Sequence, residues 1–216
     1  MSKKLEEKRD RRAAEERRRR EQRRSLRRRN LITTGIAVVV LAGVVGLIVN
    51  EQRSGSAPVG VEEAQANCTE VDTFEVGVRT HIDVGQSHEP YSSGPPTSGP
   101  HYATPAEPGF YPSPLEPEQV VHNLEHGQLV IWYRPDAPAE TIDQIETLID
   151  NLPGLQGQAL VAVPYDGVDD SFTHVLTAWG ASQSCARVSQ AVVDDFRERF
   201  QGRGPEQVGV PPFTGP

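Results

Sequence analysis

An uncharged apolar run stands out near the start of the chain. Residues 31–49 contain no charged side chain. As an α-helix this run would be about 28 Å long, close to the hydrocarbon thickness of a bilayer, and it therefore predicts a transmembrane helix. A secretory signal peptide is the alternative, but its apolar core is usually shorter and ends at small residues. Because the polar sequence NEQR follows directly at 50–53, we expect an uncleaved signal anchor.

Beyond this run, the apolar pattern predicts one α+β domain at residues 67–216. Residues 50–66 are polar and small, and we interpret them as a linker. The stretch that follows is long enough to bury a single hydrophobic core. Its alternation of helical and strand patterns predicts helices packed on a small mixed β-sheet.

Strands and helices are predicted from the period of the apolar positions. Alternating Phe74, Val76 and Val78 predict a strand at 71–82 with one buried face. The remaining predicted elements are strands at 128–133, 159–164 and 174–179, and helices at 139–152 and 184–200. His174 falls within a predicted strand, and we interpret it as a core or cross-strand residue.

A proline-rich stretch at 85–114 interrupts these elements. It carries eight prolines and has no regular apolar period. Loops of this length inside a compact domain are usually functional or disordered, and we expect this one to be ordered and to form a wall of a site. The sequence SPLE at 113–116 resembles a helix start and predicts a helix at 117–126. Gly127 then fits the left-handed position after the helix.

Charge is distributed unevenly and predicts the orientation of the chain. Residues 1–30 hold 15 Lys and Arg against six acidic residues, whereas the remainder carries a net charge of −17. The positive-inside rule places this basic segment in the cytoplasm and the acidic domain outside a cell membrane crossed once. A basic flank beside a membrane span usually contacts anionic lipid, so we expect the membrane, and not a nucleic acid, as its partner.

Cysteine usage agrees with an extracytoplasmic domain. Cys68 and Cys185 are the two cysteines, and neither lies in a CxxC pattern. Disulfides persist outside the reducing cytoplasm, and closing a loop of this length would contribute about 4–5 kcal/mol in the chain-entropy model. We therefore predict a Cys68–Cys185 disulfide, with two unrelated buried thiols as the alternative.

Histidine clustering is the clearest indication of chemistry. Five of the six histidines lie between residues 81 and 126. His122 and His126 are four residues apart, so both imidazoles can reach one ion from one helix face. His101 follows the stiff sequence Ser-Gly-Pro and is the third predicted ligand. His88, or Glu125 itself, is the fourth. Such a set suits Zn or Cu, and the absence of methionine beyond Met1 excludes a Met-rich Cu(I) site.

Two sequence blocks indicate a family. The block PPTSGPH ends at His101, and the block HNLEHG starts at His122. Both resemble the bacterial domain-of-unknown-function family numbered 3105, over roughly residues 67–200. The resemblance implies a single-span membrane protein with an outer domain, and it implies no established activity.

Alternative functions stay open at this point. In a non-catalytic module, the same histidines would brace a loop that contacts a cell-wall or protein partner of the cell envelope. In a metallohydrolase, the order HxxEH would provide two zinc ligands, with Glu125 as the catalytic general base. No GxSxG elbow, phosphate-binding loop or dinucleotide fingerprint occurs, so those activities are not predicted.

Overall fold

The computed structural model of the protein describes residues 57–152, 154–206 and 209–213. The predicted basic segment at 1–30, the predicted transmembrane helix at 31–49 and the first part of the predicted linker lie outside these residues. Within the described ranges, no helix is both long enough and apolar enough to cross a membrane.

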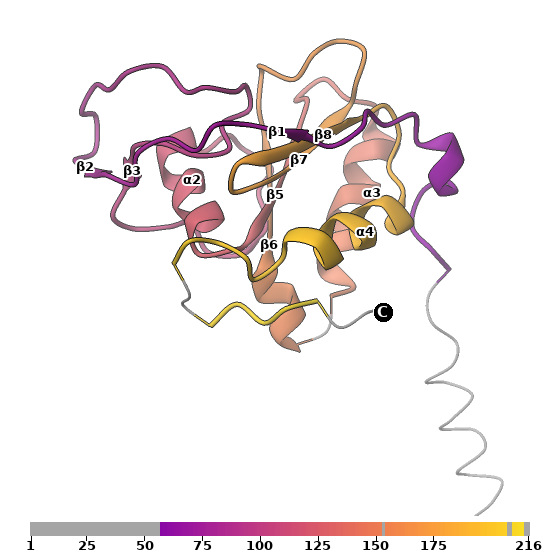
Figure 1. The fold of residues 1–216 in the computed structure, drawn as a ribbon. Helices are drawn as coiled ribbons and strands as arrows, with labels where there is room; N and C mark the ends of the chain where they lie inside the picture. The colour runs from indigo at the N-terminus through magenta and orange to yellow at the C-terminus, as the bar shows by residue number, and fades with distance from the viewer. Residues whose placement is uncertain (1–56, 153, 207–208, 214–216) are drawn as a thin grey trace, which may run out of the picture. The chain divides into compact units, whose positions relative to one another are not determined.

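A six-stranded mixed sheet forms the centre of the domain (Figure 1). Its strands lie in the order β1-β8-β7-β5-β6-β4. β5 pairs in parallel with β6, and β6 in parallel with β4, whereas the β5–β7, β7–β8 and β8–β1 pairs are antiparallel. This confirms the predicted α+β class with a mixed sheet. The strands are β1 (Asp72–Thr73), β4 (Gly109–Phe110), β5 (Leu129–Tyr133), β6 (Leu160–Pro164), β7 (His174–Ala178) and β8 (Ala181–Cys185).

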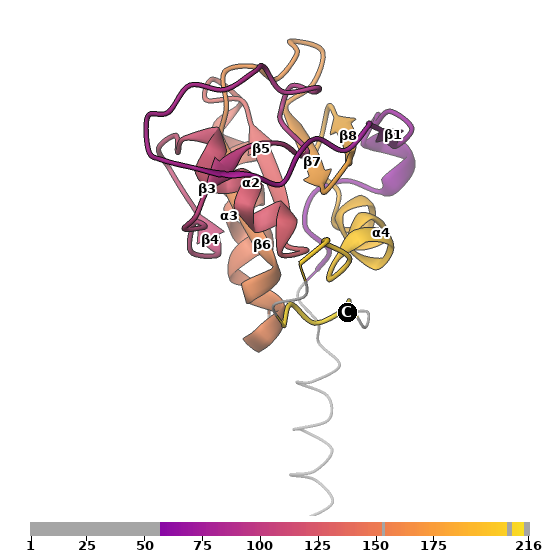
Figure 2. The ribbon, with the colours of Figure 1, turned by 60° about the vertical axis from the view of Figure 1, so that its left-hand side comes forward.

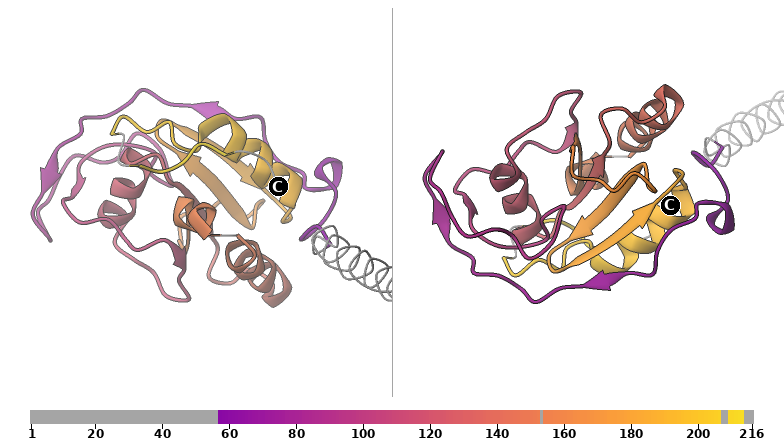
Figure 3. Two further views of the ribbon diagram at one scale, coloured as in Figure 1. Left: turned by 90° about the horizontal axis from the view of Figure 1, so that it is seen from below. Right: turned by 90° about the horizontal axis from the view of Figure 1, so that it is seen from above.

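Helices cover both faces of the sheet because the residues of β5 alternate between two hydrophobic clusters. Ile131 of β5 packs in one cluster with α3 (Ala139–Asp150) and α4 (Gln190–Phe200). Trp132 packs in the other with α2 (Pro117–Glu125). Figure 2 shows α2 apart from α4, and Figure 3 shows α2 apart from both α3 and α4. All five residues of β5 are therefore buried.

A disulfide joins the start of the domain to its sheet. Cys68 is bonded to Cys185 at the end of β8. The structured unit begins at Pro58, earlier than the predicted boundary, and includes a short 3-10 helix at Glu63–Gln65. Val61 N–H donates a 2.8 Å hydrogen bond to Val188 O. Part of the predicted linker thus packs as a component of the domain.

The predicted strand at 71–82 is wrong in its length and burial. Only β1 and β2 (His81–Ile82) are strands there. Phe74 is partly buried, and the residues from 75 to 80 are exposed, with Val76 at 51% and Val78 at 63%. Figure 3 shows this purple segment along the periphery of the domain. The apolar alternation is real, but no second layer covers it.

The predicted helix at 184–200 begins six residues too early. Ser184 and Cys185 end β8, and α4 starts at Gln190. β8 consists of small and polar residues without apolar alternation, so its strand character comes from pairing with β7 and from the disulfide. The proline-rich stretch contains two further short strands, β3 (His101–Tyr102) and β4.

His174 lies in β7 and is 1% exposed, in agreement with its interpretation as a core residue. Complete burial lowers its pKa from 6.5 to about 4, because the interior disfavours the charged imidazolium. The Thr173 hydroxyl lies 3.0 Å from its Nδ1.

We expect His174 to make the fold acid-sensitive. An unfolded chain takes up a proton at this residue near pH 6.5, whereas the folded chain does so only near pH 4. Stability is therefore full above pH 6.5 and falls by about 3 kcal/mol as the pH drops to 4. Denaturant unfolding of His174→Gln should show a shallower decline over this range than the wild type. Parallel declines would show that other groups carry the acid sensitivity.

Candidate metal centre

Three elements bring four potential metal ligands together. The parallel pair β2–β3 places His81 beside His101. The last turns of α2 add His122 and Glu125, which are three residues apart and share one helix face. One ligand atom from each of the four residues lies within 4.8 Å of those of the other three. This set is named the inner group below.

The inner group is mostly buried. His101 is fully buried, and His122 and Glu125 are each 4% exposed. The side chain of His81 is 49% exposed and forms the solvent side of the group. A cation bound here would be largely shielded from water, which strengthens its attraction to the Glu125 carboxylate.

Backbone carbonyls orient both buried imidazoles. Gly99 O lies 2.8 Å from Nδ1 of His101, and Tyr102 O lies 2.6 Å from Nδ1 of His122. A carbonyl can only accept, so each Nδ1 carries the hydrogen and donates it. The Nε2 atom of each neutral ring then has a free lone pair. Metal-binding histidines in proteins are typically held in this way by an outer-shell acceptor.

The Nε2 atoms of His101 and His81 face one carboxylate oxygen of Glu125. Nε2 of His101 lies 2.9 Å from Oε2 of Glu125, and Nε2 of His81 lies 3.8 Å from the same oxygen. A lone pair and a carboxylate oxygen repel each other unless a proton or a metal ion lies between them. The contact therefore requires either a proton shared between His101 and Glu125 or a bound cation.

Burial lowers the pKa of His122 from its usual 6.5. Desolvation is the main cause, and the neighbouring His126, His101 and His81 lower it further, against the hydrogen bond to Tyr102 O, which raises it. His122 is therefore neutral at pH 7. The neutral imidazole is the form that binds metals.

A second, more exposed group adjoins the first through His122. Nε2 of His126, the residue that caps α2, lies 2.9 Å from Nε2 of His122 and 3.2 Å from Oε2 of Glu206. Side-chain exposure is 18% for His126 and 49% for Glu206. His122, His126 and Glu206 are named the outer group below.

Close glycine packing brings Glu206 to this position. Gly202 N–H donates to Gly127 O at 2.8 Å, and Glu206 N–H donates to Glu125 O at 3.0 Å. Gly127 has a φ of +82° and lies against Gly202 and Gly204. A side chain at Gly127 or Gly204 would collide with backbone atoms of the facing segment.

The structure distributes the predicted ligands over three places. His101, His122 and Glu125 lie in the inner group, and His126 lies in the outer group. His88 lies in neither group. Its Nε2 is 3.0 Å from Oε1 of Glu118, and this hydrogen bond is the main cause that raises the pKa of His88.

Two members of the groups were absent from the predicted ligands. His81 could have been found from its position in the same histidine-rich window, but its pairing with His101 depends on the path of the intervening loop. No pattern in the sequence marks Glu206 as a potential ligand. Its position depends on the glycine contacts that return the chain to α2.

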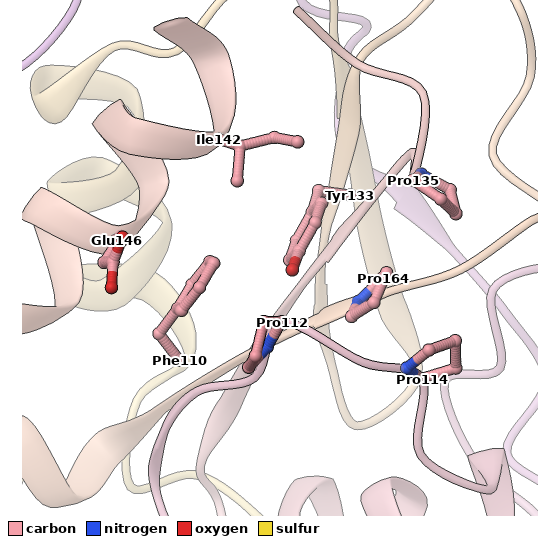
Figure 4. A pocket seen from close by; sticks show the side chains of 8 residues that line it. All are labelled: Phe110, Pro112, Pro114, Tyr133, Pro135, Ile142, Glu146 and Pro164. Carbon is pink, nitrogen blue, oxygen red and sulfur yellow. The ribbon is translucent and has the colours of Figure 1, made fainter. Parts of the chain in front are cut away.

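A separate hollow of about 490 Å³ has a different character (Figure 4). The rings of Phe110 and Tyr133 stack there at 5.6 Å. No histidine borders the hollow, and it offers apolar contact without a set of metal ligands. Its lining residues are Phe110, Pro112, Pro114, Tyr133, Pro135, Ile142, Glu146 and Pro164.

Comparison with known proteins identifies one family model. The model described as a protein of unknown function, DUF3105, matches residues 81–211, which include both histidine groups. This confirms the resemblance seen in the two sequence blocks. No curated protein and no solved structure matches the chain.

We expect Gly127→Ala to disturb the outer group and the fold together. The substitution adds strain at a positive φ, and its Cβ would lie 2.8 Å from Gly204 N. A cost of about 2–3 kcal/mol in the free energy of unfolding is expected from the strain and the clash combined. Chemical denaturation of the purified protein would measure it.

Gly85→Ala is the matched control. Gly85 has a similar φ of +78°, but nothing lies within 4 Å of an added Cβ. Gly85→Ala should therefore lower the free energy of unfolding by about 1 kcal/mol, from backbone strain without a clash. Equal losses in the two variants would contradict the close packing between Gly127 and the 202–204 segment.

Proposed function

Because the chain belongs to the DUF3105 family, whose description assigns no activity, we propose a function from its geometry: a domain that binds one Zn or Cu ion. The proposed ligands are His81, His101, His122 and Glu125. The observation that carries the proposal is the convergence of free imidazole nitrogens on a buried carboxylate.

Distances within the inner group fit a small metal ion. Two ligands of a tetrahedral zinc ion, each about 2.1 Å from the metal, are about 3.4 Å apart. The two observed separations from Glu125 Oε2 are 2.9 Å to His101 and 3.8 Å to His81. The separation that the ion requires lies between these two values.

Donor chemistry favours a transition metal over Ca²⁺ or Mg²⁺. Three imidazoles and one carboxylate suit Zn and Cu, whereas Ca²⁺ and Mg²⁺ prefer oxygen ligands. The buried Glu125 carboxylate also needs a positive partner, because an isolated buried charge is costly. A divalent ion supplies that partner and satisfies the facing nitrogen of His101.

The non-catalytic module with structural histidines is the competing explanation. In that case a proton between His101 and Glu125 holds the two side chains together without a metal. Catalysis is not part of the proposal, because Oε2 of Glu125 lies against a ligand nitrogen and is not set apart as a base for a bound water.

Metal analysis of the untagged full chain tests the proposal. After dialysis against limiting Zn or Cu, we expect close to one metal ion per chain by mass spectrometry of the element. His101→Ala and Glu125→Gln should each lower the affinity by more than about 10-fold, because a ligand is lost. The upward shift of thermal unfolding with metal should be smaller in these two variants than in the wild type.

His88→Ala is the control for this experiment. It removes a histidine from the same window that lies in neither group, so metal affinity should remain at the wild-type value. A wild-type chain that binds no metal at micromolar concentrations would exclude the proposal and leave the hydrogen-bonded His101–Glu125 pair as the explanation.

We also propose that the domain is held outside a membrane by the uncharged run at 31–49. The basic segment before this run, the acidic composition after it and the Cys68–Cys185 disulfide support this orientation. A partner in the cell envelope would meet the domain there.

Protease treatment of intact cells tests the orientation. We expect added protease to remove the domain, while an epitope placed at the N-terminus stays protected until lysis. Protection of the domain in intact cells would reverse the proposed topology.

A further inference from the structure

The outer group has a different architecture from the inner group. It offers three ligands, of which Glu206 is about half exposed, whereas the inner group offers four that are mostly buried. An ion in the outer group would keep a coordination position open to water or to a donor molecule. Such incomplete, exposed sites suit exchange more than storage.

His122 links the two groups through one atom. Its Nδ1 donates a hydrogen bond to Tyr102 O, so Nε2 is the single ring nitrogen that can bind a metal. One nitrogen lone pair can bind one metal ion at a time. The two groups therefore cannot both hold an ion through His122.

We propose that the outer group is a transfer position, through which a divalent Zn or Cu ion enters and leaves the inner group while bound to His122. This inference rests on the proposed metal binding of the inner group. It assigns His126 and Glu206 to exchange of the ion, and not to its final coordination.

The transfer is a ligand exchange without a change of oxidation state. A hydrated divalent ion first binds His126, Glu206 and His122 and loses water, and the hydrogen on Nε2 of His126 moves through solvent to Nδ1 of the same ring. The bonds to His126 and Glu206 then break, and bonds to His101, His81 and Glu125 form, while the bond to His122 persists. If His101 carried a second proton before loading, that proton leaves to solvent.

The ion has only a short path to travel between the two groups. Nε2 of His126 lies 2.9 Å from Nε2 of His122, the ligand that both groups share. An ion that binds His126 is therefore close enough to bind His122 as well. Both histidines belong to the end of α2, so their separation is set by one helical turn and one Gly127 cap. No rearrangement of the fold is needed.

Metal exchange kinetics of the untagged full chain test the proposal. The metal-free protein is mixed with Zn(II) in a stopped-flow instrument, and release from the loaded protein is followed with excess EDTA. We expect His126→Ala and Glu206→Gln to slow both loading and release about 10-fold or more. The equilibrium affinity should change less than about threefold, because removing an intermediate raises the barrier and leaves the end states unaltered.

Glu198→Gln is the matched control for Glu206→Gln. Glu198 is an exposed acid on α4 and belongs to neither group, so its loss should leave both rates unchanged. Glu206→Gln also preserves side-chain size and the backbone bond to Glu125 O, which separates a kinetic effect from a folding defect.

Three results would overturn the transfer role. Unchanged rates in both variants would show that the ion passes directly beside the exposed His81. A loss of affinity in His126→Ala as large as in His101→Ala would make His126 a resident ligand. Two Zn ions per chain would contradict the sharing of His122. Absence of Zn binding in the wild type would instead exclude the proposed function itself.

Discussion

Both faces of β5 are covered by helices, because its residues alternate between two hydrophobic clusters. α3 and α4 cover one face, and α2 covers the other through Val120 and Leu124. Once these apolar residues of α2 face the sheet, His122 and Glu125 are directed toward β3 and the proline-rich loop. The position of the histidine groups is thus a consequence of burying β5, and a change in how α2 packs would move them together.

Proximity alone is a weak argument for a metal, since histidines often act as structural hydrogen-bond partners. The orientation of the imidazole rings is a stronger argument. Nδ1 of His101 and Nδ1 of His122 each donate to a separate backbone carbonyl, so Nε2 of His101 is directed at Glu125 and Nε2 of His122 at His126. The same arrangement explains how a carboxylate can remain buried at Glu125. Orientation, burial and charge therefore depend on a small set of backbone contacts.

The sequence predicts the parts of the site that are local, and not those that depend on the path of the chain. The pairing of His122 with His126 and the cap at Gly127 follow from helical spacing and from glycine's access to positive φ. The rigid sequence before His101 predicts it as a ligand, and His101 lies in the inner group. His88 was chosen from the same window, but its neighbour Glu118 binds it elsewhere.

Long-range features escaped prediction for a common reason. β8 contains few apolar residues and becomes a strand by pairing with β7, and the exposed segment around Val76 has strand-like alternation without a covering layer. Glu206 reaches α2 because Gly202 and Gly204 allow two backbones to approach closely. Each of these outcomes depends on residues far apart in the sequence, which a local period does not record.

The Cys68–Cys185 bond also has a mechanical consequence. A pulling force applied between the two ends of the chain would follow the shortest covalent path, from Cys68 across the sulfur atoms to Cys185. The intervening loop would carry no tension, and it contains every member of the inner group together with His126. Among these ligands, only Glu206 lies on the part of the chain that carries tension. Stretching the chain would therefore pull Glu206 away from the outer group before it disturbed the inner group.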